Sequence, residues 1–262
     1  MNHWNIGQLP YSWAPKNVTC AWSGTDSLEN YNKNPNKDEW ENIDITYQYN
    51  TQGFRCTDLT NFLGQQINIA LGCSFTEGIG LAIDQVWPSL LEQQLKHPVV
   101  NLGLGSGTTD TVARILTNIS TLYNIHTVYI LWPNLHRFEA CYTIDDFGSK
   151  VKNAVWKVRE PTDTAPTYRH LITPILPMTT QIEYTWALTD EMANQRFNRN
   201  KSTVDLLAQV GNFRIVQYTV DDVITKFRSS NGTENYLRDS ARDGQHWGAD
   251  TQKAISTMML SS

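Results

Sequence analysis

Apolar runs alternate with amphipathic stretches along residues 67–131. Three short runs, at residues 67–71, 99–102 and 127–131, are mostly apolar, which is typical of strands buried on both faces of a parallel sheet. The stretches between them repeat their apolar positions every three or four residues, as helices with one buried face do. The first helix begins near Pro88. The inner-face residues are Leu90, Leu91 and Leu95 in the first helix and Val112, Ile115, Leu116, Ile119 and Leu122 in the second.

The C-terminal part of the chain continues this alternation. A polar helix is expected over about residues 186–210, a strand at 213–217 and a closing helix at about 249–260. The closing helix turns four apolar side chains to the core: Ala254, Ile255, Met258 and Met259. Because strands and helices alternate, the chain is expected to form an α/β fold with a central parallel sheet covered by helices on both faces.

Two regions depart from the alternation. Residues 1–66 are rich in Asn, Trp and Tyr and contain turn-forming stretches, so we interpret them as an N-terminal extension packed on a core of residues 67–262. Residues 140–182 contain several prolines and lose the strand and helix rhythm. They predict an insertion over the strand ends, where segments that cover a substrate usually lie.

Composition and charge exclude several classes of function. Of the 262 residues, 40% are apolar and 18% charged, which is a globular balance. The formal net charge of −5 argues against a nucleic-acid partner. No basic leader or membrane-spanning run is present, so no membrane role is expected, and the default location is cytoplasmic, with a virus-encoded origin left open.

The cysteines do not form a recognisable metal motif. Cys20, Cys56, Cys73 and Cys141 are widely separated, and no Cys-x-x-Cys pair occurs, so neither a zinc site nor a dense disulfide framework is expected. Free thiols are the default interpretation. Pairing of Cys20 with Cys56 remains open for an oxidising environment.

A serine follows the first core strand in a setting that suits a nucleophile. The segment from Gly72 to Gly78 reads Gly-Cys-Ser-Phe-Thr-Glu-Gly and begins where the strand ends. A small residue there allows a sharp turn, which would present the hydroxyl of Ser74 at the carboxyl edge of the sheet, where open α/β folds bind ligands. A serine hydroxyl needs a base to take its proton, and that base needs an orienting acid.

Such a pair of residues occurs near the C-terminus. Asp243 stands three residues before His246, so one turn can bring the carboxylate to Nδ1 and leave Nε2 facing Ser74. Taken singly, each feature is typical of something simpler: serines after strands often cap helices, and Asp-x-x-His often forms a solvated turn. Their order along the chain, one after the first core strand and the other before the last helix, favours the catalytic interpretation.

Here the sequence resembles the SGNH (GDSL-type) serine hydrolases, including uncharacterised phage-encoded ones. That family carries its nucleophile in a Gly-Asp-Ser-like block and its acid and base in a late Asp-x-x-His block. The resemblance implies a three-layer α/β/α, flavodoxin-like fold, with Ser74 as nucleophile and Asp243 and His246 as acid and base. It is closest over about residues 47–110 and looser over 127–139 and 213–260.

The resemblance also implies an oxyanion hole. Its donors would be the Ser74 amide, an amide of the loop at residues 101–108, and the side chain of Asn134 after the third strand. An ungapped comparison puts Ser106 where the family usually has glycine, and Gly107 is the alternative one residue along. The flanks of Asn134 depart from the family pattern, as does Cys73, which replaces the usual aspartate.

Upstream, residues 50–55 resemble a segment often found before the nucleophile block in divergent members. Its Arg55 is a candidate for binding a substrate carboxylate, but an ion pair that tethers the extension is the favoured role. Three tryptophans of the extension, Trp13, Trp22 and Trp40, are candidates for stacking on sugar rings, with core packing the favoured role of each.

The sequence therefore predicts a serine esterase that acts through an acyl-enzyme on short acyl esters, with O-acetyl groups on carbohydrate as the preferred substrate class and no metal or organic cofactor. His126 and His136 are the alternative bases. A silent binding or structural module with the same fold is the first rival. A phosphate-cradling role for Gly103, Gly105 and Gly107 is weaker, because a dinucleotide fingerprint would need glycine at Thr108. The oligomeric state is not predicted.

Overall fold

The centre of the protein is a four-stranded parallel sheet. The computed structural model describes residues 14–135, 137, 139–142, 155–158, 190–231 and 239–262. The sheet strands are β3 (Gln66–Leu71), β4 (Val99–Asn101), β5 (Asn124–Trp132) and β8 (Arg214–Thr219). Their order is β4-β3-β5-β8, and every neighbouring pair is parallel. The order reverses direction between β3 and β5, and ligands of open α/β sheets bind at the carboxyl side of such a point.

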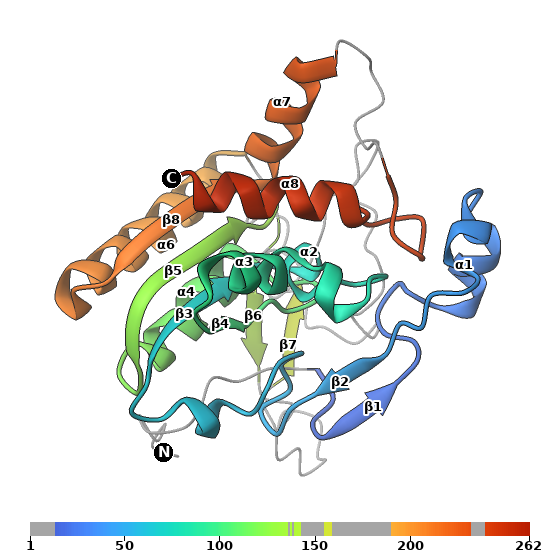
Figure 1. Ribbon diagram of the computed structural model, residues 1–262. Coiled ribbons are helices and arrows are strands. Elements are labelled where there is room, and N and C mark those ends of the chain that lie inside the picture. Colours follow the sequence, from blue (N-terminus) through green and yellow to red (C-terminus); the bar gives the residue numbers. More distant parts are fainter. Residues whose placement is uncertain (1–13, 136, 138, 143–154, 159–189, 232–238) are drawn as a thin grey trace, which may run out of the picture.

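Helices cover both faces of this sheet (Figure 1). Side chains of β3 and β5 alternate between two apolar clusters, as the pleat of a strand requires. One cluster joins Ile69 and Val128 to α4 (Thr109–Ile119) and α6 (Asp190–Gly211). The other cluster joins Ala70 and Tyr129 to α3 (Trp87–Leu95) and α8 (Ala249–Leu260). The expected α/β/α arrangement with a central parallel sheet is therefore confirmed.

The predicted inner faces of the helices are largely buried. Val112, Ile115, Leu116 and Ile119 of α4 are at most 1% exposed, while Leu122 lies beyond the helix and is partly buried. The helix begins where expected because the Thr108 side chain accepts a hydrogen bond from the Thr111 amide, which satisfies one of the free donors of the first turn. In α8, Ile255, Met258 and Met259 are buried and Ala254 is partly exposed.

The N-terminal part packs beside the sheet on its own apolar cluster. It contains the antiparallel pair β1 (Val18–Cys20) and β2 (Tyr47–Tyr49), α1 (Leu28–Lys33) and 3-10 turns at Lys37–Trp40 and Leu59–Phe62. Trp40, Ile45, Tyr47 and Tyr49 are buried against residues that follow β3 and against Ala241. Figure 1 shows β1, β2 and α1 to one side of the central sheet. Its division from the core at residue 66 remains a prediction.

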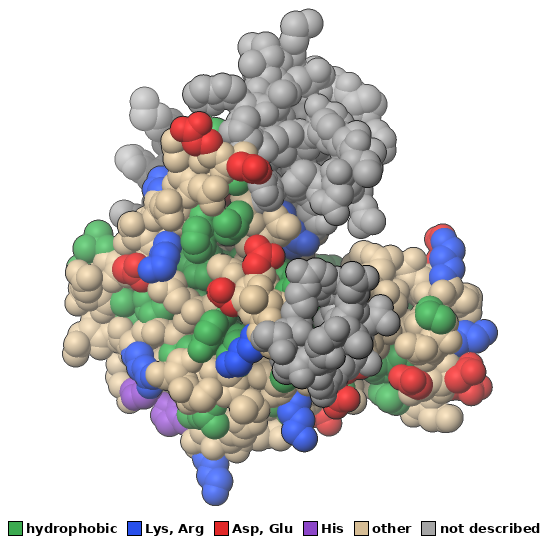
Figure 2. All heavy atoms as spheres, turned by 90° about the horizontal axis from the view of Figure 1, so that it is seen from above, with side chains coloured by type: hydrophobic (Ala, Val, Ile, Leu, Met, Phe, Trp, Pro, Cys, Tyr) green, Lys and Arg blue, Asp and Glu red, His purple; other side chains and the backbone are tan. Residues whose placement is uncertain are grey.

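The remaining elements lie around the insertion and the C-terminal half. The predicted insertion at residues 140–182 falls mostly outside the described residues; its described parts belong to the antiparallel pair β6 (Glu139–Tyr142) and β7 (Val155–Val158). The helix α7 (Val220–Asn231) was not expected from the pattern. Among the described residues, no helix is long and apolar enough to cross a membrane. Figure 2 shows acidic and basic side chains interspersed over the described part of one face.

Candidate active site

The turn after β3 places Ser74 at the carboxyl edge of the sheet. Gly72 follows the strand, and Ser74 is the first residue of the short helix α2 (Ser74–Glu77). A side chain at Gly72 would collide with Thr76 Oγ1 and lie 2.8 Å from the carbonyl oxygen of Leu131, so only glycine fits. The predicted strand-to-helix turn is therefore present, and it holds Ser74 with 8% of its surface exposed.

Ser74, His246 and Asp243 form one hydrogen-bonded chain. His246 Nε2 lies 2.7 Å from Ser74 Oγ, and His246 Nδ1 lies 2.7 Å from Asp243 Oδ2. Asp243 Oδ1 accepts hydrogen bonds of 3.0 Å from the amides of Gln245 and His246. The structure thus brings these three residues together, although Ser74 and His246 are 172 positions apart in the sequence. Such an arrangement can pass the serine proton to the imidazole.

The environment of Asp243 favours its charged form. Burial acts to raise the pKa of this carboxyl, but the hydrogen bond and charge of His246, together with hydrogen bonds from Thr25 and the Gln245 amide, hold the pKa at about 2. The side chain of Asp243 is fully buried and that of His246 is 13% exposed. Phe75 packs against the imidazole edge to face, with 5.1 Å between ring centroids. The ring of His246 is therefore held on two sides.

The two alternative bases are not at this place. His126 lies near the beginning of β5, at the opposite end of the strands from Ser74, and its Nδ1 is 2.9 Å from Thr127 Oγ1. His136 lies outside the described residues. Of the described histidines, His246 is thus the one that meets Ser74.

The glycine-rich loop after β4 packs against the nucleophile turn. A side chain at Gly103 would collide with the Glu77 amide and lie 2.7 Å from the Thr76 carbonyl carbon. Asn101 fixes this approach, because its Nδ2 donates to the Thr76 carbonyl at 2.8 Å and its Oδ1 accepts from the Gly103 amide at 2.9 Å. The close fit between two loops explains the glycine at 103, and it requires no bound phosphate.

The two candidate oxyanion donors of this loop, Ser106 and Gly107, differ in backbone conformation and hydrogen bonding. Ser106 has a φ of +61°, a left-handed conformation that glycine adopts more readily than serine. The Gly107 amide donates to the Leu104 carbonyl at 2.7 Å, so it is already engaged within the loop. The amide of Ser74 stands at the first position of a helix, where no preceding turn supplies an acceptor. The roles of the Ser74, Ser106 and Gly107 amides as oxyanion donors remain predictions.

Asn134 follows the end of β5, the strand beside β3 in the sheet. It therefore lies at the same edge as Ser74. Its side chain is exposed, and its carbonyl accepts a hydrogen bond of 3.2 Å from the Arg137 amide. Its role as an oxyanion donor remains a prediction.

A buried glutamate links the loop after β4 to the N-terminal part. Glu77 is 3% exposed and accepts hydrogen bonds from the Tyr49 hydroxyl at 2.5 Å and from the Gly105 amide. Burial raises the pKa of this carboxyl, against the lowering effect of those hydrogen bonds and of the positive charge of Arg55. Glu77 was not identified from the sequence, since its partners lie in two distant segments.

Arg55 differs from both roles considered for it. It is 2% exposed and donates to backbone carbonyls of Gly78 at 2.6 Å, Leu81 at 2.8 Å and Thr46 at 3.1 Å. Its guanidinium therefore ties the loop after α2 to the N-terminal part through backbone carbonyls, and it forms no ion pair with an acid of the described residues. Trp40 is a core residue, Trp22 is 37% exposed beside Arg242, and Trp13 lies outside the described residues.

Three further residues of the N-terminal part reach the Asp243 loop and were missed by sequence reasoning. Thr25 Oγ1 donates to Asp243 Oδ2 at 2.6 Å. Asp26 forms a buried ion pair with Arg242 at 2.6 Å, and Asn34 Nδ2 donates to the Arg242 carbonyl at 3.2 Å. No spacing motif connects positions more than 200 residues apart, so the sequence carried no signal for these contacts.

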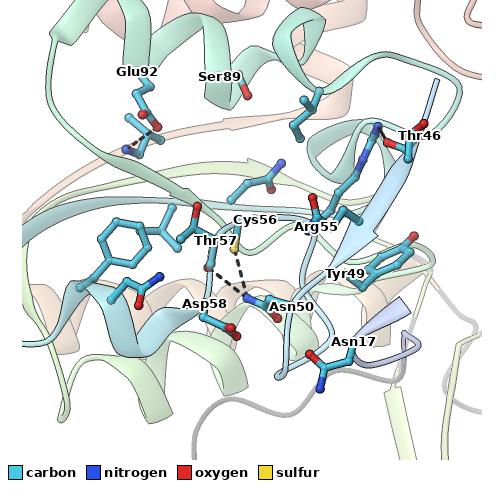
Figure 3. A pocket seen from close by; sticks show the side chains of 17 residues that line it. Asn17, Thr46, Tyr49, Asn50, Arg55, Cys56, Thr57, Asp58, Ser89 and Glu92 are labelled. Carbon is cyan, nitrogen blue, oxygen red and sulfur yellow. Dashed lines mark hydrogen bonds between the residues drawn. The ribbon is translucent and has the colours of Figure 1, made fainter. Parts of the chain in front are cut away.

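A pocket of about 660 Å³ lies elsewhere, between the edge strand β4 and the N-terminal part (Figure 3). Its lining includes Asn50, Asp58, Glu92 and Arg55, and does not include Ser74, Asp243 or His246. Among the described residues, no group of three or more His, Cys, Asp or Glu side chains is placed to hold a metal ion. Cys20, Cys56 and Cys73 are free thiols.

No protein-family model and no curated protein matches the chain. Solved structures with a similar fold include several named as esterases and one named as a lipolytic protein of the G-D-S-L family. One is a lipolytic protein of the G-D-S-L family from Desulfitobacterium hafniense, with 16% identity over 75% of this chain and 97% of that chain and a TM-score of 0.33. Another is an aryl esterase from M. smegmatis, with 16% identity over 74% of this chain and 99% of that chain and a TM-score of 0.33. A third is a carbohydrate acetylesterase from Sinorhizobium meliloti, with 14% identity over 75% of this chain and 99% of that chain and a TM-score of 0.32. At such values the likeness says nothing of substrate or activity.

Proposed function

We propose that this chain is a serine esterase of the SGNH type, with Ser74, His246 and Asp243 as its catalytic triad. The observation that carries the proposal is the unbroken chain from Ser74 Oγ through the imidazole to a buried carboxylate, with both links at 2.7 Å. The side of the sheet on which it lies, after β3 and beside the reversal of strand order, is where ligands of such folds bind.

In the proposed reaction, Ser74 Oγ attacks the ester carbonyl while His246 Nε2 takes its proton. Asp243 holds Nδ1 and stabilises the imidazolium that forms. The imidazolium then gives its proton to the departing alcohol, which leaves an acyl-enzyme on Ser74. A water molecule, deprotonated by the neutral imidazole, attacks the acyl-enzyme and releases the acid. The amides of Ser74 and Ser106 and the side chain of Asn134 are the proposed donors to the oxyanion.

The proposed substrates are short acyl esters, with O-acetyl groups on carbohydrate as the first class to test. A screen of nitrophenyl esters of graded chain length, together with acetylated glycans, would identify the preferred acyl group.

The variant Ser74→Ala tests the nucleophile, because it removes one oxygen from a site at a turn and should leave the fold intact. We expect it to reduce hydrolysis by several orders of magnitude. A loss of only about tenfold corresponds to about 1.4 kcal/mol of transition-state stabilisation, too little for a nucleophile. Equal rates for wild type and Ser74→Ala on every ester would instead favour a silent module with this fold.

A further inference from the structure

The hydroxyl of Thr25 contacts the acid and base of the proposed triad. Its Oγ1 donates to Asp243 Oδ2 at 2.6 Å and lies 3.4 Å from His246 Nδ1. The same Oδ2 lies 2.7 Å from Nδ1 of His246, while the other carboxylate oxygen accepts two backbone amides. The Asp243 carboxylate therefore has four hydrogen bonds. Three come from residues of the loop that contains Asp243, and the fourth comes from Thr25.

The turn that carries Thr25 is fixed by its own hydrogen bonds. The amide of Ser23 donates to the carbonyl of Asp26, and the amide of Asp26 to the carbonyl of Ser23, both at 3.0 Å. Gly24 has a φ of +61°, which a glycine adopts without strain. Asn30 Nδ2 donates to the Thr25 carbonyl at 2.6 Å. The backbone on both sides of Thr25 is thus held in place.

A buried ion pair joins this turn to the loop of Asp243. Asp26, the neighbour of Thr25, is fully buried and accepts from Arg242, the neighbour of Asp243, at 2.6 Å. The Tyr47 hydroxyl donates to the same carboxylate of Asp26 at 2.6 Å. The contact of Thr25 with Asp243 and that of Asp26 with Arg242 are successive links between the same two segments, so the ion pair sets the position of the threonine.

We propose that Thr25, supplied by the N-terminal part of the chain, is a positioning residue that fixes the Asp243 carboxylate and, through it, the ring of His246. The proposal rests on the esterase function proposed above. Because Thr25 contacts the acid and not Ser74, it acts on the reaction through the orientation of the pair. The N-terminal part is then a component of the active site as well as a cover for the core.

Thr25→Val tests this role, since valine keeps the shape of threonine and removes the hydroxyl. We expect kcat to fall about tenfold or more with KM changed less than about threefold, because orientation of the base matters to the chemical step more than to binding. Thr25→Ser restores the hydroxyl and should recover kcat to within about threefold of wild type. Ser27→Ala is the structural control, because Ser27 caps α1 in the same segment at 3.2 Å from the Asn30 amide. It should lower the melting temperature by about 2 to 4 °C without changing kcat.

A second measurement does not depend on any substrate. The proton between His246 Nδ1 and Asp243 should give a low-field proton resonance, which we expect to shift or broaden in Thr25→Val and to return in Thr25→Ser. A Thr25→Val enzyme with kcat within twofold of wild type, or a Thr25→Ser enzyme as impaired as the valine variant, would overturn the proposal. So would an unmoved resonance. Failure of the esterase proposal itself would show differently, as equal rates for wild type and Ser74→Ala.

Discussion

Asp243 remains ionised at any pH suited to an esterase assay, since its pKa is about 2. Its charge can therefore stabilise the imidazolium of His246 throughout such an assay. We expect His246→Ala to remove nearly all of kcat/KM, because Ser74 then has no base to take its proton. Asp243→Asn should be less damaging than His246→Ala, because a weakened orienting group leaves the base in place. Measuring kcat/KM of the wild type and the two variants checks this. Full activity of both variants would exclude this pair.

The same carboxylate also makes stability depend on pH. The folded pKa of Asp243 is about 2, below the value of about 3.9 for an exposed aspartate, so its stabilising contribution is present above about pH 4 and is lost as pH falls toward 2. The shift corresponds to about 2 to 3 kcal/mol. Urea unfolding at pH 6 and at pH 3 should therefore show a smaller pH-dependent loss in Asp243→Asn than in wild type. An equal loss in the two proteins would contradict this.

Asn134 gives the sharpest test of the oxyanion hole. As a side-chain donor at the edge of the sheet, it should stabilise charge that develops only in the transition state. Asn134→Ala is then expected to lower kcat by about 100- to 1,000-fold with a much smaller change in KM. If Asn134 only shapes the turn after β5, kcat will stay near wild type and the free energy of unfolding will fall by about 1 kcal/mol. Kinetics and thermal unfolding of the same variant distinguish the two results.

At the scale of elements, the turn between β3 and α2 is limited by space. A methyl group at Gly72 would meet Thr76 Oγ1 and the backbone carbonyl of Leu131 in the neighbouring strand. The carbonyl of β5 cannot withdraw without breaking the sheet, so Gly72→Ala should cost about 1 to 3 kcal/mol and displace Ser74 as well. Gly64→Ala is a suitable control, because nothing lies within 4 Å of the added carbon there, although its φ of +78° brings some backbone strain. Denaturant unfolding of both variants checks the prediction; equal stability of Gly72→Ala and wild type would contradict it.

Sequence patterns predicted the elements whose buried side chains follow a regular spacing along consecutive residues. The strands β3, β4, β5 and β8 and the helices α3, α4 and α8 each bury a face that can be read from consecutive residues. The pair β1 and β2 was not predicted, because each strand has three residues and they are joined across 26 intervening positions. The helix α7 was not predicted, although its apolar residues at positions 220, 223, 224 and 227 repeat at helical spacing.

In the candidate site too, residues in short sequence motifs could be predicted, and residues that act through contacts distant in the sequence could not. Ser74, Asp243 and His246 stand in short motifs at the ends of elements, so they could be named from the sequence. Thr25 could not, since its hydrogen bond to Asp243 spans 218 positions. The role of Arg55 was also beyond reach, because the backbone carbonyls that it meets carry no signature in the sequence.

At the scale of the whole molecule, the ion pair between Asp26 and Arg242 connects the N-terminal part to the last loop before α8. Both side chains are at most 9% exposed, and Asp26→Asn would leave the charge of Arg242 buried without its partner. We expect a loss of about 3 to 5 kcal/mol in the free energy of unfolding, together with lower activity. The matched control is Glu29→Gln in the exposed pair with Lys33, which should leave the free energy of unfolding unchanged. Unfolding in urea measures both, and equal stability of the two variants would mean that the pair does not tie these segments together.

The most direct test of the account is covalent labelling with a fluorophosphonate probe, followed by mass spectrometry of the digested protein. The probe reacts with a serine only when a base activates it. We expect one adduct per chain, located on Ser74, with labelling absent in Ser74→Ala and at least about 100-fold slower in His246→Ala. Absence of labelling in the wild-type protein, or an adduct on another residue that persists in Ser74→Ala, would contradict it.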